Sequence, residues 1–311
     1  MKIWIIALAG LWAVTAQGAP EAEDFVRVVD LKDGRTQLQT AVISVRGRAG
    51  QEVDLIGAVH VADAAYYQQL NERFTGYEVV LFEMVGDPNK RLPAKEAKVA
   101  NEEEASKTAK GSADSRMAWL GVLYETMRSK LKLTGQMDEI NYQAPNFVHA
   151  DMEADEFFEA QEKQGESFLG LWWKATVASM NGTREQPMEH QLGLVEILEM
   201  LMKEDGSNEL KRVVARQFDQ IEVLLSDVEG EQGTVILAGR NKVALKALKE
   251  QVKLGKRKIA IFYGAAHLPD MLKRMTRQGY VVTNQQWLTA WKIAAPQPPQ
   301  EKPQQRKTEP Q

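Results

Sequence analysis

The pattern that most constrains this fold is an apolar run that ends in Gly-x-x-His, because it occurs twice in the chain. The first copy ends at His60 (GAVH) and the second at His267 (GAAH). Each is followed by a helical pattern, a Gly-Tyr pair and a further apolar run. Glycine lets a chain turn sharply where a strand ends, and strands that alternate with helices are typical of α/β sheets. The sequence therefore predicts an α/β fold built from two related strand–helix–strand halves.

The expected strands indicate a mixed sheet. Residues 39–45 and 52–56 are apolar or alternating, and a glycine-containing turn lies between them, so they predict an antiparallel hairpin. Strand–helix–strand units instead join parallel strands. The other expected elements are a helix capped by Asp63, strands over residues 79–82 and 258–263, and a helix that begins near Pro269.

The 311 residues are enough for a sizeable core without disulfides. We expect one α/β domain over residues 24–295. Apolar residues recur at helical spacing over residues 117–226, which predicts a large helical insertion between the two halves. Residues 86–116 are polar and charged and carry no candidate chemistry. Residues 296–311 form a Pro/Gln-rich tail that we expect to be disordered.

Residues 1–18 have the features of a secretory signal peptide. Lys2 precedes an apolar run over residues 3–16, and small residues precede a cleavage position after Gly18. This run is shorter than the roughly 20 apolar residues that a membrane-spanning helix needs. We therefore expect a periplasmic or secreted protein with no stable membrane span after cleavage, the alternative being an uncleaved anchor. The chain has no cysteine, which fits a bacterial periplasm better than a eukaryotic extracellular setting.

The charge balance argues against nucleic acid as a partner. The formal net charge is −4, whereas binding to phosphates needs concentrated lysine and arginine. A peptide or a small molecule as the substrate is compatible with this charge balance.

The candidate chemistry lies at the carboxyl ends of the expected strands, where open α/β sheets place their sites. Both motif histidines emerge there, and Glu83 directly follows a buried apolar strand. Two histidines and a glutamate are a common ligand set for a catalytic divalent ion. His60, His267 and Glu83 are therefore candidate metal ligands. The alternatives are two satisfied core histidines and a surface glutamate at a strand end.

Further polar residues could support this site. Arg240 and Asn241 open an amphipathic helix, and an arginine there could hold a carboxylate or stabilise an oxyanion. His149 and Asp151 form another polar pair. Asp151 could orient a ligand, but aspartate is a preferred N-cap, so the sequence favours a cap on the helix that begins near Met152.

Taken together, the two Gly-x-x-His motifs, Glu83 and Arg240-Asn241 resemble the TraB/PrgY–GumN–TIKI family in order and spacing. The resemblance covers about residues 39–291. Members include pheromone-shutdown proteins and metal-dependent proteases that act on secreted signals, and the fold is similar to that of erythromycin esterases and ChaN-like haem-binding proteins. The resemblance implies His60, Glu83, Arg240 and His267 as site residues. It leaves the reaction open, because such folds include hydrolases and binding proteins.

The function expected from the sequence is metal-dependent hydrolysis of a peptide or amide bond in the periplasm. His60, His267 and Glu83 would hold Mn²⁺, Co²⁺ or Zn²⁺ and lower the pKa of a bound water. If Glu83 is not a ligand, it would serve as the general base, and Arg240 would stabilise the oxyanion. Two alternatives stay open: a metal-free, esterase-like hydrolase with a histidine base, and a non-catalytic protein that binds haem or a peptide signal.

Overall fold

The computed structural model describes residues 25–88, 128–164, 207–216 and 234–296. Four predictions lie wholly or mostly outside these ranges. They concern the signal peptide over residues 1–18, the charged segment over 86–116, much of the insertion over 117–226, and the tail over 296–311.

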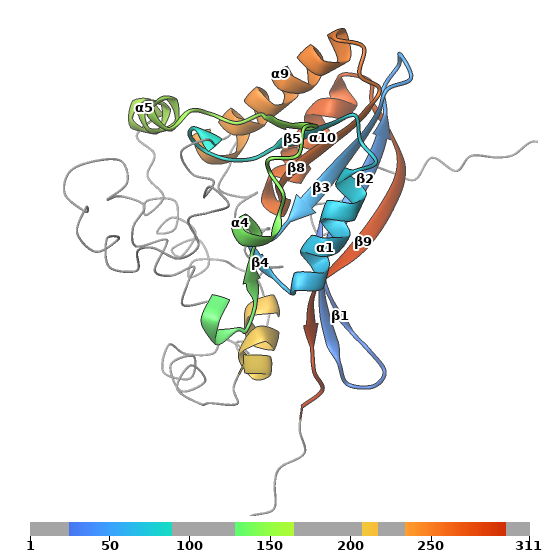
Figure 1. The fold of residues 1–311 in the computed structure, drawn as a ribbon, viewed down its shortest axis with the longest axis vertical. Coiled ribbons are helices and arrows are strands. Elements are labelled where there is room, and N and C mark those ends of the chain that lie inside the picture. The colour runs from blue at the N-terminus through green and yellow to red at the C-terminus, as the bar shows by residue number, and fades with distance from the viewer. Residues whose placement is uncertain (1–24, 89–127, 165–206, 217–233, 297–311) are drawn as a thin grey trace, which may run out of the picture.

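A seven-stranded mixed sheet forms the centre of the fold (Figure 1), which confirms the predicted α/β class. Its order is β1-β2-β3-β8-β5-β7, and β9 also pairs with β2. Strands β3, β8, β5 and β7 run parallel to one another, whereas β2 pairs antiparallel with β1, β3 and β9. The bounds are β1 Val26–Asp30, β2 Thr36–Arg46, β3 Glu52–Ala58, β5 Val79–Phe82, β7 Phe147–His149, β8 Lys258–Gly264 and β9 Val281–Ile293.

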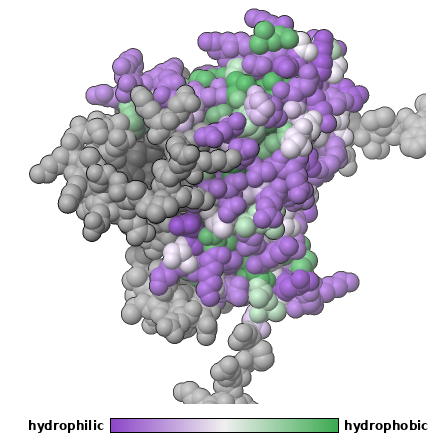
Figure 2. All heavy atoms as spheres, viewed as in Figure 1, coloured by the Kyte–Doolittle hydropathy of each residue, from purple (hydrophilic) through white to green (hydrophobic). Residues whose placement is uncertain are grey.

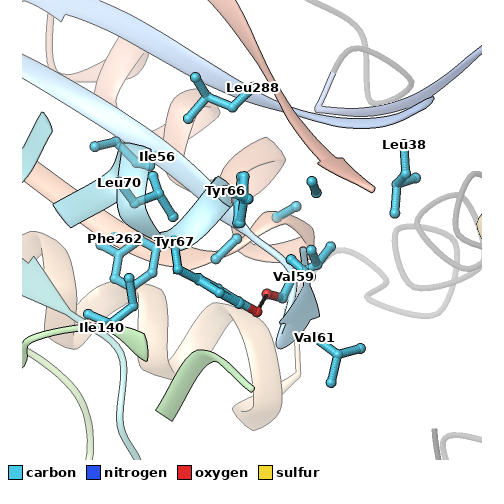
Figure 3. Close-up of a cluster of buried hydrophobic side chains, with 14 of the residues drawn as sticks. Leu38, Ile56, Val59, Val61, Tyr66, Tyr67, Leu70, Ile140, Phe262 and Leu288 are labelled. Carbon is cyan, nitrogen blue, oxygen red and sulfur yellow. Dashed lines mark hydrogen bonds between the residues drawn. The ribbon is translucent and has the colours of Figure 1, made fainter. Parts of the chain in front are cut away.

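Helices cover both faces of the sheet. Helix α1 (Ala64–Phe74) packs on one face, and α9 (Arg240–Lys253) and α10 (Leu268–Arg277) pack on the other. Alternate residues of one strand therefore enter different cores: Ile56 of β3 contacts the α1 side (Figure 3), and its neighbour Leu55 contacts the other side. Burial on both faces explains why the central parallel strands are almost wholly apolar.

Short elements surround this framework. They are β4 (Val61–Ala62), β6 (Thr134–Gly135), α4 (Gln136–Glu139), α5 (Ala154–Gln164), the π-helical turn η3 (Val235–Gly239), the 3-10 turn η4 (Ala265–His267) and a helix over 207–216. None of the helices in the described ranges is long and apolar enough to cross a membrane. On the face seen in Figure 2, the described surface is mostly hydrophilic, with small separate hydrophobic areas.

Two details differ from the sequence prediction. The segment predicted as a helical insertion contributes a strand, β7, to the main sheet. The Asn146 amide donates to the carbonyls of Phe74 and Tyr77, which holds this strand beside β5. The second half also departs from the first, because β9 runs antiparallel to β2 instead of parallel to β8. The largely exposed first half of β9 suits an edge strand, whereas β5 is buried throughout.

Candidate active site

The four parallel strands end at one edge of the sheet, and each is followed there by a polar residue. Ala58 at the end of β3 pairs with Gly264 of β8, and Phe82 of β5 pairs with residues of both β8 and β7. The residues that follow these ends include His60, His267, Glu83 and Asp151. The sheet therefore brings together the residues that the sequence singled out at its carboxyl edge.

Helix α1 holds the first Gly-x-x-His loop in place. The Tyr66 hydroxyl donates to the Gly57 carbonyl at 3.0 Å, and the Tyr67 hydroxyl donates to the Val59 carbonyl at 2.9 Å (Figure 3). Both tyrosines are almost fully buried. Their rigid rings fix the backbone just before His60.

The motif glycines are needed because other groups approach their Cα atoms closely. A Cβ on Gly57 would lie 3.2–3.3 Å from Leu268, from the Ala265 side chain and from a backbone oxygen of β2. A Cβ on Gly264 would lie 3.3 Å from a carboxylate oxygen of Glu83. Glycine thus permits close packing in the first motif and close approach of the acid in the second.

We expect Gly57→Ala to lower the free energy of unfolding by about 1–3 kcal/mol, as overpacking of a rigid core does. Two of the three close neighbours are a methyl group next to a backbone and a backbone oxygen, which cannot turn aside. Urea denaturation measures the effect. Gly239→Ala is the control, because its closest neighbour is the flexible end of Met152. An equal loss in both variants would contradict this explanation.

Arg240 is the centre of the site. Its Nε and Nη2 donate to the two carboxylate oxygens of Asp151 at 2.9 and 2.6 Å, and Nη2 also donates to Glu83 Oε1 at 2.6 Å. The Arg240 side chain is 9% exposed, that of Glu83 11% and that of Asp151 0%. A paired geometry of this kind is the strong form of an arginine–carboxylate interaction. Helix α9 begins at Arg240 and presents it to the strand ends.

Glu83 is buried but ionised. Burial alone would raise the pKa of its carboxyl group, but the charge of Arg240, together with the interactions of His267 and His60, outweighs burial and holds this pKa well below its ordinary value. Its second oxygen, Oε2, accepts the Gly264 N–H at 2.5 Å. Glu83 therefore acts as a fixed negative charge between an arginine and two histidines.

The two motif histidines have different surroundings. His267 is 4% exposed, and its Nε2 lies 3.4 Å from Arg240 Nη1 and 3.5 Å from Glu83 Oε1. Its Nδ1 donates to Asn241 Oδ1 at 2.7 Å. His60 is exposed, and its Nδ1 donates to Gln136 Oε1 at 3.2 Å. The pair thus consists of one interior imidazole and one that faces the solvent side of the site.

The sequence also singled out Asn241, Asp151 and His149. Two of them contact Arg240 or His267, and the third does not. Asn241 contacts His267, and Asp151 pairs with Arg240. Asp151 also accepts the Met152 N–H at 2.8 Å, but α5 begins only at Ala154, so the predicted helix-capping role is wrong and Asp151 serves chiefly as the partner of Arg240. His149 is directed elsewhere, with Nε2 2.6 Å from the Met84 carbonyl.

Three contributors were missed by sequence reasoning. Gln136 holds His60, and its own amide donates to the Tyr142 hydroxyl at 2.7 Å. The Tyr263 hydroxyl donates to the carbonyl of Ala150 at 2.5 Å, and burial beside the acids of the site raises its pKa. Asp270 accepts from Asn241 at 2.8 Å. No sequence spacing indicates the contacts of Gln136 with His60, of Tyr263 with Ala150 or of Asp270 with Asn241, because each joins segments far apart in the chain.

The donor types of the site suit a divalent ion, but their arrangement does not. Both carboxylate oxygens of Glu83 already accept hydrogen bonds, and Nε2 of His267 faces a guanidinium, which would repel a cation. In the ranges that the structure describes, no three His, Asp or Glu side chains are grouped so that they could hold a metal ion. A Mn²⁺, Co²⁺ or Zn²⁺ site at His60, His267 and Glu83 stays a prediction that requires Arg240 to move.

Comparisons with known proteins do not identify the site. No protein-family model, curated protein or solved structure matches the chain significantly. The resemblance to the TraB/PrgY–GumN–TIKI family therefore stays a prediction.

Proposed function

We propose that the chain is a hydrolase for peptide or amide bonds that works without a metal ion, with His60 as general base and Arg240 as the oxyanion donor. The observation that carries this proposal is the buried, ionised Glu83 held between Arg240 and the histidines at the carboxyl ends of the parallel strands. Strongly shifted pKa values cluster at functional sites, where they prepare acids and bases for catalysis.

His60 is suited to the role of base because it is exposed and its proton position is set. Gln136 accepts from Nδ1, so in the neutral imidazole the basic lone pair lies on Nε2. A neutral imidazole can take a proton from an attacking water and return it to the leaving amine. Glu83 is less suited to this task, because its low pKa makes it a weak base.

Arg240 is suited to stabilise the charge that develops on the attacked carbonyl. Two of its nitrogens, Nε and Nη2, are committed to Asp151 and Glu83, whereas among the described residues Nη1 makes only the longer contact with His267. Guanidinium has five N–H donors, so Nη1 has a hydrogen to offer an oxyanion. Asp151 and Glu83 hold the fork in position before the substrate binds, which is how such donors become effective.

A second candidate is the metal-dependent hydrolase that the sequence predicts. The observation that favours it is that the charges of both His60 and His267 act on Glu83, so all three groups share one electrostatic site. In that case these residues would hold the ion, and the ion would supply an activated water. A non-catalytic binding protein for haem or a peptide signal is the third possibility to be distinguished.

The test is cleavage of a defined library of unmodified peptides by the purified chain, followed by mass spectrometry, with and without EDTA. We expect activity to persist in EDTA and to fall by about 10²–10⁴-fold in His60→Ala, the usual contribution of a general base. The matched control is His149→Ala, whose imidazole contacts the Met84 carbonyl and the Phe82 ring instead of Glu83 or Arg240, and which should lose less than about tenfold.

The other outcomes separate the candidates. Loss of activity in EDTA, with bound metal lost in both His60→Ala and His267→Ala, would support the metal-dependent hydrolase. No cleavage under any metal, together with a haem absorption band or retention of intact peptides, would support a binding protein. Either outcome overturns the metal-free proposal.

A further inference from the structure

A line of hydrogen bonds leads away from His267 to the start of α10. Nδ1 of His267 donates to Asn241 Oδ1 at 2.7 Å, and Asn241 Nδ2 donates to Asp270 Oδ2 at 2.8 Å. Nδ2 also donates to the His267 carbonyl at 3.2 Å. Asn241 is 0% exposed. The orientation of an amide buried in this way is set by the hydrogen-bond partners around it.

The acceptors around Asn241 decide which way its amide points. An ionised carboxylate and a backbone carbonyl can only accept hydrogen bonds. Both lie beside the same atom of Asn241, which must therefore be its NH₂ group, and its oxygen must face His267. Since that oxygen can only accept, the proton of the neutral His267 ring lies on Nδ1.

The lone pair of His267 is then on Nε2, directed at Arg240. Nε2 lies 3.4 Å from Arg240 Nη1 and can accept from it, whereas an unprotonated Nε2 makes no hydrogen bond with Glu83 Oε1, 3.5 Å away. If Asn241 were turned over, the proton would move to Nε2, and two N–H groups would face each other across this contact. A proton on Nδ1 of His267 thus lets Nε2 accept a hydrogen bond from Arg240, whereas a proton on Nε2 would make the ring repel the guanidinium.

We propose that Asp270 is a positioning residue that fixes the tautomer of His267 through Asn241 and so orients Arg240. Its carboxylate is itself held by Arg274, whose Nε donates to Oδ2 at 2.6 Å from one turn further along α10. The importance of the tautomer for catalysis rests on the proposed function, whereas the tautomer itself does not.

The experiment is nitrogen-15 NMR of the His267 ring in the full chain, at an alkaline pH where the imidazole is neutral. In the wild type we expect Nδ1 to carry the proton. Asp270→Ala removes the carboxylate acceptor and leaves the NH₂ group of Asn241, among the described residues, with the longer bond to the His267 carbonyl alone, so a population protonated on Nε2 should appear. Asp270→Asn can still accept from Asn241 and should restore the wild-type tautomer.

Arg274→Gln is the matched control, because it removes the ion pair on α10 and keeps the bond between Asn241 and Asp270. It should leave the His267 tautomer unchanged. Turnover should fall about three- to tenfold in Asp270→Ala, the size expected for one buried hydrogen bond, and should recover in Asp270→Asn.

The inference is overturned if wild-type His267 is protonated on Nε2, or if folded Asp270→Ala keeps the wild-type tautomer. Should Asp270→Ala fail to fold, Asn241→Leu replaces it and should shift the tautomer in the same direction. The NMR result does not depend on hydrolysis. A chain that cleaves no peptide but shows the predicted tautomers would contradict the proposed function alone.

Discussion

Arg240→Met should lower the free energy of unfolding by about 3–5 kcal/mol, the usual loss when one partner of a buried ion pair is removed. The substitution leaves the carboxylates of Asp151 and Glu83 at 0% and 11% exposure without their cation. Methionine has a similar length, so lost volume contributes little to the expected change. Urea denaturation at neutral pH measures the difference from wild type.

The pH dependence gives this prediction a second readout. Because the pKa of Glu83 is lowered in the folded state, its contribution to stability is present above the unfolded-state pKa of about 4.3. It is lost as the pH falls through the lower, folded-state value. In Arg240→Met the acids no longer gain from being ionised, so the gap between variant and wild type should narrow toward acid pH.

Controls can separate this effect from a general loss of charge. Arg35→Met removes an arginine that pairs with Asp33 at 61% and 52% exposure, and it should leave the urea midpoint nearly unchanged. Asp151→Asn in the Arg240→Met background should recover part of the loss, because one unpaired buried charge is then absent. If the two arginine variants lose equal stability, Arg240 does not balance the buried acids.

Glu83→Gln should lower kcat/KM by about 10²–10³-fold, the range found when a fixed electrostatic group of an active site is removed. The glutamine oxygen can accept the Gly264 N–H only if its NH₂ group faces Arg240, where it meets another donor. The guanidinium is then held by Asp151 alone. Steady-state kinetics on the best peptide from the library measures the change.

The same substitution should cost less stability than Arg240→Met. Asp151 still balances Arg240, so Glu83→Gln leaves no buried charge unpaired. A large loss of turnover with a small shift of the urea midpoint would therefore mark Glu83 as part of the catalytic machinery. Unchanged turnover with a large loss of stability would show instead that the acid serves the fold alone.

The strands were predictable because they are buried on both faces or alternate along a hairpin. The predicted runs over residues 39–45, 52–56, 79–82 and 258–263 lie within β2, β3, β5 and β8. Strand β7 was not predictable, because three residues are too few to show a period. Its place in the sheet depends on β5 and on the Asn146 amide.

Only the site residues that directly follow a predicted strand could be located from the sequence. The positions of His60, Glu83 and His267 follow from apolar runs that stop before a polar residue. The pairing of Arg240 with Asp151 could not be predicted from the sequence. Asp151 also fits a local helix cap, and sequence spacing does not indicate contacts between residues so far apart in the chain. Gln136 and Asp270 were missed for the same reason.

The order of the strands also decides when during synthesis the site can exist. Strand β8 lies between β3 and β5, although it comes from the last quarter of the chain. Strands β3 and β5 therefore have no shared partner until β8 is made, and such distant pairings form slowly. His267 and Arg240 arrive with the same late segment. A partly synthesised chain would carry His60 and Glu83 without the residues that organise them, so the proposed activity would begin only after β8 has joined the sheet.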